Sequence, residues 1–234
     1  MTRATKTTER MITRVEELLA SFATCLDAFD SGQVFSGPSI YFHRKALDLR
    51  QGKSVAEAAN DPALVEAIYA TLASWGMHRM GPRGAKLVDF DAFEAGIVKA
   101  LPLLVGIESR KLPTLSMEEA GPVGDTIWEA ITLVHASASE TQIVAGSKVL
   151  HHLLPDLIPP IDRTYTLTFF YSHKTLAAPE DKTFAEIFPL FRSIAADARA
   201  SVLRTGPMYS SATKTIDNAI VGYVRRNELA PEEE

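Results

Sequence analysis

The segment from Pro155 to Pro160 limits the possible folds more than any other part of the sequence. Its three prolines cannot continue a helix, because proline lacks the backbone N–H and disfavours helical geometry in the residue before it. Apolar residues at helical spacing lie on both sides, over 142–154 and 163–173. We therefore expect a helix, a rigid break and a second helix.

Two charged residues frame this break. Lys148 lies near the end of the first expected helix, and Asp162 stands where the N-cap of the second helix should be. The positive end of a helix dipole favours a carboxylate, so capping alone explains Asp162. The alternative is a preorganised anionic site, with basic groups supplied by the preceding helix.

The order of features here is a lysine-bearing helix, a short apolar linker, the residues Ile-Pro-Pro-Ile-Asp-Arg-Thr-Tyr (158–165) and a second apolar helix. Over residues 142–170 this order resembles the helix-hairpin-helix DNA glycosylases. The resemblance implies a glycosylase-like helical fold and a DNA duplex with a flipped base as the partner. It also implies that Asp162 is the catalytic aspartate.

Removal of a base leaves positive charge on the sugar, which a nearby ionised aspartate stabilises while it orients the attacking water. Asp162 is the candidate for this role. A desolvated Lys148 would instead form a Schiff base, which adds strand cleavage to base removal. Both residues are therefore candidate catalytic residues.

The rest of the chain repeats the helical apolar period, and no segment alternates like a β-strand. This pattern predicts an all-α protein of about nine or ten helices, in one compact unit over residues 1–234. A two-lobed form would place its cleft near 75–86 and 148–163. The tail at 229–234 is expected to be disordered.

Residues 75–86 have no helical or strand period, yet they hold a tryptophan, a histidine, three cations and three glycines. Their apolar side chains either plug the core beneath the loop or form a wedge, with a basic rim, that touches nucleic acid. Aromatic rings beside basic groups, which suit nucleic acid, also occur near residue 42. The candidate DNA contacts are Trp75, Met77, His78, Arg79, Arg83, Lys86, Tyr41, His43, Arg44, His151 and Arg163.

Other site chemistries lack the residues they need. His151 and His152 are adjacent, so on a helix they point about 100° apart and do not readily share one metal ion. The sequence contains no His-Glu-x-x-His pattern, no nucleophile elbow and no dinucleotide fingerprint. We expect no metal and no cofactor. Two classes of protein remain: a base-removing enzyme, and a non-catalytic helical module that binds nucleic acid or protein.

Composition sets the remaining limits. A net charge of −5 argues against binding nucleic acid through bulk charge, so a local basic face would have to do it. The single Cys25 excludes a disulfide framework. We find no signal-peptide core and no apolar run near the ~20 residues that span a bilayer. A cytoplasmic protein without a membrane partner is expected, and the oligomeric state is open.

Overall fold

The computed structural model describes residues 3–32, 36–77, 86–176, 178–202 and 204–227. Within these ranges the chain is helical, and the only β-bridge joins Leu87 to Ser137. The α-helices are α1 (Arg3–Ala20), α2 (Phe22–Ser31), α3 (Pro38–Arg50), α4 (Val55–Ala59), α5 (Pro62–Leu72), α6 (Phe90–Ile107), α7 (Met117–Val134), α8 (Ile143–Leu153), α9 (Thr168–Tyr171), α10 (Glu180–Ala196) and α11 (Ala212–Arg226). Short turns of π-helix form η1 (Ala73–Met77) and η3 (Arg163–Leu167), and 3₁₀ turns form η2 (Leu112–Thr114), η4 (Ala198–Ala200) and η5 (Pro207–Tyr209).

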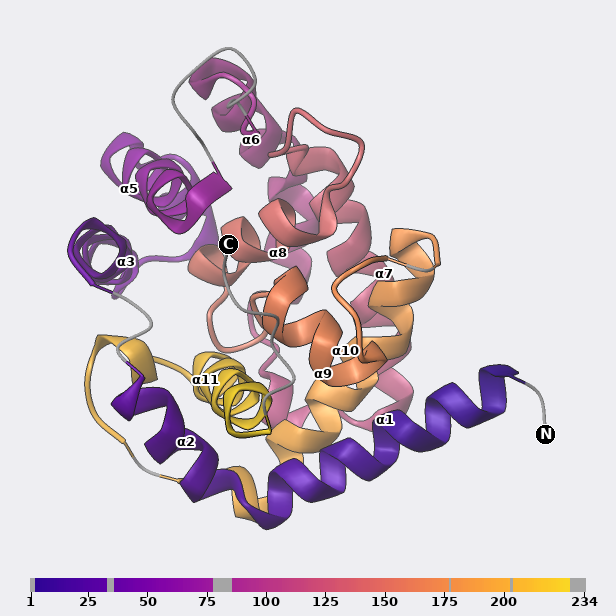
Figure 1. Ribbon diagram of the computed structural model, residues 1–234. Helices are drawn as coiled ribbons and strands as arrows, with labels where there is room; N and C mark the ends of the chain where they lie inside the picture. Colours follow the sequence, from indigo (N-terminus) through magenta and orange to yellow (C-terminus); the bar gives the residue numbers. More distant parts are fainter. Residues whose placement is uncertain (1–2, 33–35, 78–85, 177, 203, 228–234) are drawn as a thin grey trace.

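The prediction of an all-α fold is confirmed, but the predicted number of helices was too low. The described residues form eleven α-helices rather than nine or ten. One cause is Ser21, whose backbone leaves helical geometry at φ −124° and divides the first helical stretch of the chain into α1 and α2. In Figure 1, α1 runs along the lower edge of the molecule while α2 turns to lie beside α11.

Capping side chains begin several helices. Ser54 accepts a hydrogen bond from the backbone N–H of Glu57, and Asp89 does the same from that of Ala92. Pro102 lies inside α6 without ending it, and α10 ends at Ala196.

Helix α8 lies in the middle of the molecule and places the site (Figure 1). All but two of its residues are buried. One exception is Lys148, so a helix that is otherwise almost wholly buried carries an ammonium group. None of the described helices is both long and apolar enough to cross a bilayer. The tail from 229 onward lies outside the described residues.

Candidate functional site

One cavity of about 270 Å³ is lined by two lysines and two aspartates. It lies between the start of α3, the turn η1, helix α8, the turn η3 and helix α11. The stretches 75–86 and 148–163, which were expected to flank a cleft, each contribute to its wall. Its lining residues are Ser39, Ser74, Trp75, Lys148, Pro160, Ile161, Asp162, Tyr165, Lys214 and Asp217.

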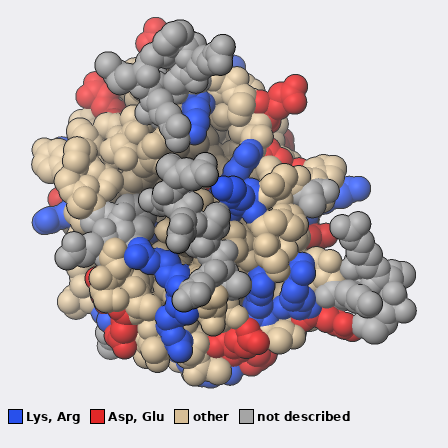
Figure 2. Space-filling model, viewed as in Figure 1, with Lys and Arg blue, Asp and Glu red and all other residues tan. Residues whose placement is uncertain are grey.

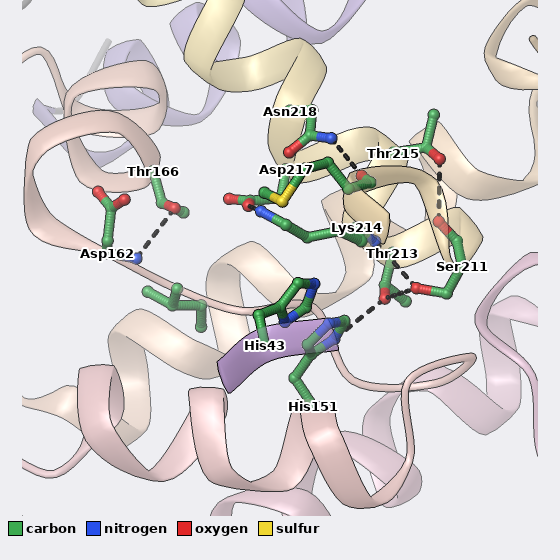
Figure 3. A network of polar contacts seen from close by, with 12 residues as sticks. His43, His151, Asp162, Thr166, Ser211, Thr213, Lys214, Thr215, Asp217 and Asn218 are labelled. Atoms are coloured by element: carbon green, nitrogen blue, oxygen red, sulfur yellow. Dashed lines mark hydrogen bonds and ion pairs between the residues drawn. The ribbon is translucent and has the colours of Figure 1, made fainter. Parts of the chain in front are cut away.

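Asp162 is held rigidly in this wall. Its Oδ1 accepts a hydrogen bond from the backbone N–H of Tyr165 at 2.6 Å, which confirms its prediction as an N-cap. Its own N–H donates to Thr166 Oγ1 at 3.1 Å (Figure 3). One residue earlier, the N–H of Ile161 donates to Ser147 Oγ on α8 at 3.0 Å. The end of the proline-rich break is therefore tied to both α8 and η3, and the carboxylate is preorganised.

Lys148 lies over the ring of Trp75, with its Nζ 5.5 Å from the ring centroid. Burial lowers the pKa of Lys148, against the raising effects of the Asp162 and Asp217 carboxylates. Lys214 lowers this pKa further. An amine in such surroundings gives up its proton more readily than a surface lysine, which suits a group that transfers a proton.

A second lysine–aspartate pair enters the cavity from α11. Lys214 Nζ lies 2.5 Å from Asp217 Oδ2, and both side chains are buried. Figure 3 shows both side chains extending toward the side of the cavity where Asp162 lies. Burial raises the pKa of Asp217, and the Asp162 carboxylate adds to this effect, whereas Lys214 opposes it. The cavity therefore holds two ammonium and two carboxylate groups.

Sequence reasoning missed Lys214 and Asp217. Their spacing of three residues puts them on one face of a helix, and α11 is buried on every side from Thr213 to Val224. A charged pair within an otherwise buried helix was the available signal, since buried charges are rare unless paired. The partner elements of that face could not be found from the spacing.

The predicted DNA contacts divide into several groups. Lys86, Arg44 and Arg163 are exposed, and Tyr41 is 63% exposed. Half-buried Met77 packs against the core, which fits the plug rather than the wedge, while half-buried Trp75 lines the cavity. Met77 therefore belongs to the core and Trp75 to the cavity wall, although they are only two positions apart.

Two predicted contacts are corrected by their burial, and three cannot be placed. His43 and His151 have no exposed surface, so their side chains belong to the interior and not to a face that DNA touches. Hydrogen bonds to buried partners hold both rings there. His78, Arg79 and Arg83 lie outside the described residues.

Basic groups gather on the face that carries the central helices. In Figure 2, Lys and Arg side chains form several separate groups beside and below the centre of this face, whereas Asp and Glu side chains lie mainly toward its edge. Both Arg44 of α3 and Arg163 of η3 are exposed next to cavity-lining elements. A protein with a net charge of −5 thus has a local basic region.

A larger cavity, of about 560 Å³, offers less chemistry. Several of its charged groups already have partners, as in the pairs Arg50–Glu108 at 3.8 Å and Arg110–Glu119 at 2.5 Å. Ion pairs of this kind are ordinary surface features of proteins. The larger volume therefore does not identify the candidate site. The charged residues that line the smaller cavity do.

In the described part of the chain, no three His, Cys, Asp or Glu side chains are grouped as a metal ion would require. No family model, curated protein or solved structure matches this chain. Function is therefore argued from the geometry of the cavity.

Proposed function

We propose that this chain is a DNA glycosylase-like enzyme that hydrolyses the N-glycosidic bond of a damaged or modified base. The observation that carries the proposal is the joint position of Asp162 and Lys148 in the wall of one cavity. A volume of about 270 Å³ lies just below the usual range of ligand pockets, so it suits a single base better than a larger ligand.

Asp162 supplies the charge that the reaction needs. When the bond between base and sugar breaks, the base leaves with the electron pair and the sugar C1′ becomes positive. The Asp162 carboxylate stabilises this cation and orients a water molecule, whose oxygen forms the new bond to C1′. The water proton passes to the carboxylate. The hydrogen bond from the backbone N–H of Tyr165 fixes the Asp162 carboxylate before the substrate arrives.

Lys148 serves the departing base. The base carries an extra electron pair and must take up a proton, which an ammonium of lowered pKa donates readily. Donation leaves a neutral amine in a site where burial favours that form. In this role Lys148 forms no covalent bond to the sugar, so borohydride should trap no cross-link between the protein and DNA.

DNA is the proposed partner because exposed basic and aromatic side chains lie on the elements that line the cavity, although Arg44 itself lines the larger cavity. Arg163 follows Asp162 directly, and exposed Arg44 and Tyr41 lie on α3, whose Ser39 lines the cavity. Arginines at these positions would contact phosphates, and an exposed tyrosine could fill the space of the flipped base. A flipped base would then enter between α3 and η3.

The test compares binding and base release in two matched variants. Asp162→Asn keeps a side-chain acceptor for the cap but removes the charge. Asp156→Asn removes an exposed carboxylate from the same break, and this residue does not line the cavity. We expect Asp162→Asn to bind duplex DNA like wild type and to lose base release. Asp156→Asn should keep both.

Two other outcomes would support a different function or a different mechanism. Binding without release in wild type, unchanged by Asp162→Asn, would support a non-catalytic nucleic-acid-binding module, which the acidic net charge does not exclude. Equal release by wild type and Asp162→Asn would remove Asp162 from the mechanism. Salt dependence of binding should be measured in parallel, because phosphate contacts weaken binding steeply as salt rises.

A further inference from the structure

Two buried histidines next to the cavity form a continuous chain of polar contacts. His43 Nδ1 lies 3.0 Å from His152 Nε2, and neither side chain has exposed surface. At one end, His43 Nε2 lies 3.2 Å from the carbonyl oxygen of Pro207. At the other end, His152 Nδ1 lies 2.7 Å from the backbone carbonyl oxygen of Lys148. The chain thus joins η5, α3 and α8.

This chain is one proton short when both rings are neutral. A carbonyl oxygen only accepts hydrogen bonds, and a neutral imidazole carries one N–H. The contacts of His43 and His152 with each other and with two carbonyls number three. Two neutral rings supply two N–H groups, so one ring nitrogen faces an oxygen without a proton. One added proton would complete every contact.

The surroundings keep that proton out at neutral pH. Burial, with smaller contributions from the nearby Lys214 and Lys148, lowers the pKa of His152 to about 4, although the hydrogen bond to the Lys148 carbonyl acts in the opposite direction. The pKa of His43 is also strongly lowered, first by burial and then by His152, Lys214 and His151. Titratable groups on α3, α8 and α11 therefore oppose a charge on the pair. It is neutral at pH 7 and takes up a proton only in acid.

The same two rings hold Trp75 in the cavity wall. The centroid of the Trp75 ring lies 5.4 Å from that of His43 and 5.6 Å from that of His152. The Nζ atoms of Lys148 and Lys214 lie 5.5 and 6.0 Å from the same centroid. Trp75 thus separates neutral imidazoles from ammonium groups that its π-system attracts.

We propose that His43 and His152 are positioning residues that hold Trp75 in the cavity wall only while both imidazole rings are neutral. One proton on the pair adds a third cation beside the ring that Lys148 and Lys214 already approach. Like charges in a buried site repel strongly, so the two lysine side chains move away from Trp75 and the cavity wall loosens around the ring. Acid therefore disrupts the cavity before the fold is lost. This inference concerns the cavity wall and holds whatever the cavity binds.

Tryptophan fluorescence reports the state of this contact. The chain has two tryptophans, so Trp128→Phe leaves Trp75 as the only tryptophan, and excitation at a wavelength that tyrosine does not absorb selects its emission. A protonated imidazole quenches indole emission much more than a neutral one does. We expect the emission of this variant to fall as the pH passes through about 4, while the helical circular dichroism signal stays constant.

Histidine variants in the same background assign the transition. His43→Asn and His152→Asn should each abolish it, whereas His173→Gln, which changes an exposed histidine, should leave it intact. Constant emission down to pH 3.5, or an unchanged transition in both asparagine variants, would overturn the proposal. So would emission that changes only together with the helical signal.

A second measurement removes the dependence on the asparagine variants being folded. Nitrogen NMR of the imidazoles in folded Trp128→Phe protein follows the ring nitrogens directly. We expect both rings to be neutral at pH 7 and to gain one shared proton near pH 4. A ring that is protonated at pH 7, or two separate protonations near pH 6.5, would contradict the proton count.

Discussion

At the scale of single residues, the cavity shows how burial and pairing decide what a lysine can do. Lys148 and Lys214 both approach Trp75. Lys214 has a carboxylate of its own at 2.5 Å. Burial lowers the pKa of Lys148, with Asp162 and Asp217 acting against it. The two amines therefore differ in their surroundings, because Lys214 is paired with a carboxylate whereas burial dominates at Lys148.

Removing either member of the Lys214–Asp217 pair should shift the pKa of Lys148 in opposite directions. Lys214→Met removes a cation and should raise it, whereas Asp217→Asn removes an anion and should lower it. NMR titration of isotope-labelled lysine, assigned with Lys148→Arg, measures both shifts. Lys111→Met, a change at an exposed pair, is the control. Shifts of the same sign in both variants would show that only folding was disturbed.

Asp162 should contribute to stability as a cap, separately from its charge. Asp162→Ala should reduce the free energy of unfolding by about 1 kcal/mol, whereas Asp162→Asn should keep it to within about 0.5 kcal/mol, because asparagine caps as well as aspartate. Urea unfolding at pH 7 measures both. A loss in Asp162→Asn as large as that in Asp162→Ala would make this variant unsuitable as an activity control.

At the scale of elements, close contacts between helices bring α11 to the cavity. Gly222 of α11 lies against α2, where an added Cβ would be 1.8 Å from the carbonyl oxygen of Cys25. Only a glycine allows this approach of the two backbones. Because Lys214 and Asp217 are on the same helix, the packing of α11 on α2 also determines where they lie.

Gly222→Ala should therefore destabilise the protein by about 3 kcal/mol or more, since the backbones must separate. Gly106→Ala in α6 is the matched control. An added Cβ there meets nothing within 4 Å, and the change should stabilise the helix by about 0.5 kcal/mol. Chemical denaturation of both variants tests this. Similar stability in the two would refute the close contact.

Local patterns in the sequence predicted the helical class and the cap at Asp162, but not every helix boundary or the partners of each helix. The Asp162 cap depends on residues a few positions away, so the sequence predicted it. The contact between His43 and His152 joins residues 109 positions apart. Such contacts depend on which helices pack together, and helical periodicity specifies only which face of each helix is buried.

At the scale of the whole molecule, buried neutral histidines link stability to pH. The folded pKa of His152 is about 4, and those of His43 and His151 are also well below the ordinary value of 6.5. Below pH 6.5 the unfolded chain therefore binds more protons than the folded one, and stability falls as the pH falls. Above pH 6.5 these groups contribute no pH dependence.

We expect His152 alone to account for a loss of about 3 kcal/mol between pH 6.5 and 4, from its pKa shift. Urea unfolding at several pH values gives the slope. His152→Asn should make the slope shallower, and His173→Gln, at an exposed site, should not. An equal slope in wild type and His152→Asn would mean that other groups carry the acid sensitivity.

The whole molecule combines an acidic net charge with a basic face over its central helices (Figure 2). Such an arrangement suits a protein that meets DNA through one face and does not coat it. The elements that border the cavity also carry exposed Arg44 and Arg163. The proposed reaction and the proposed partner thus use the same side of the protein.

The most direct measurement of this function is release of free base, detected by mass spectrometry. Duplexes carrying oxidised, deaminated, alkylated or naturally modified bases would be incubated with wild type and with Asp162→Asn. We expect wild type to release at least one of these bases and Asp162→Asn to release none. If folded wild-type protein released no base from any duplex of the panel, the proposed glycosylase activity would be contradicted.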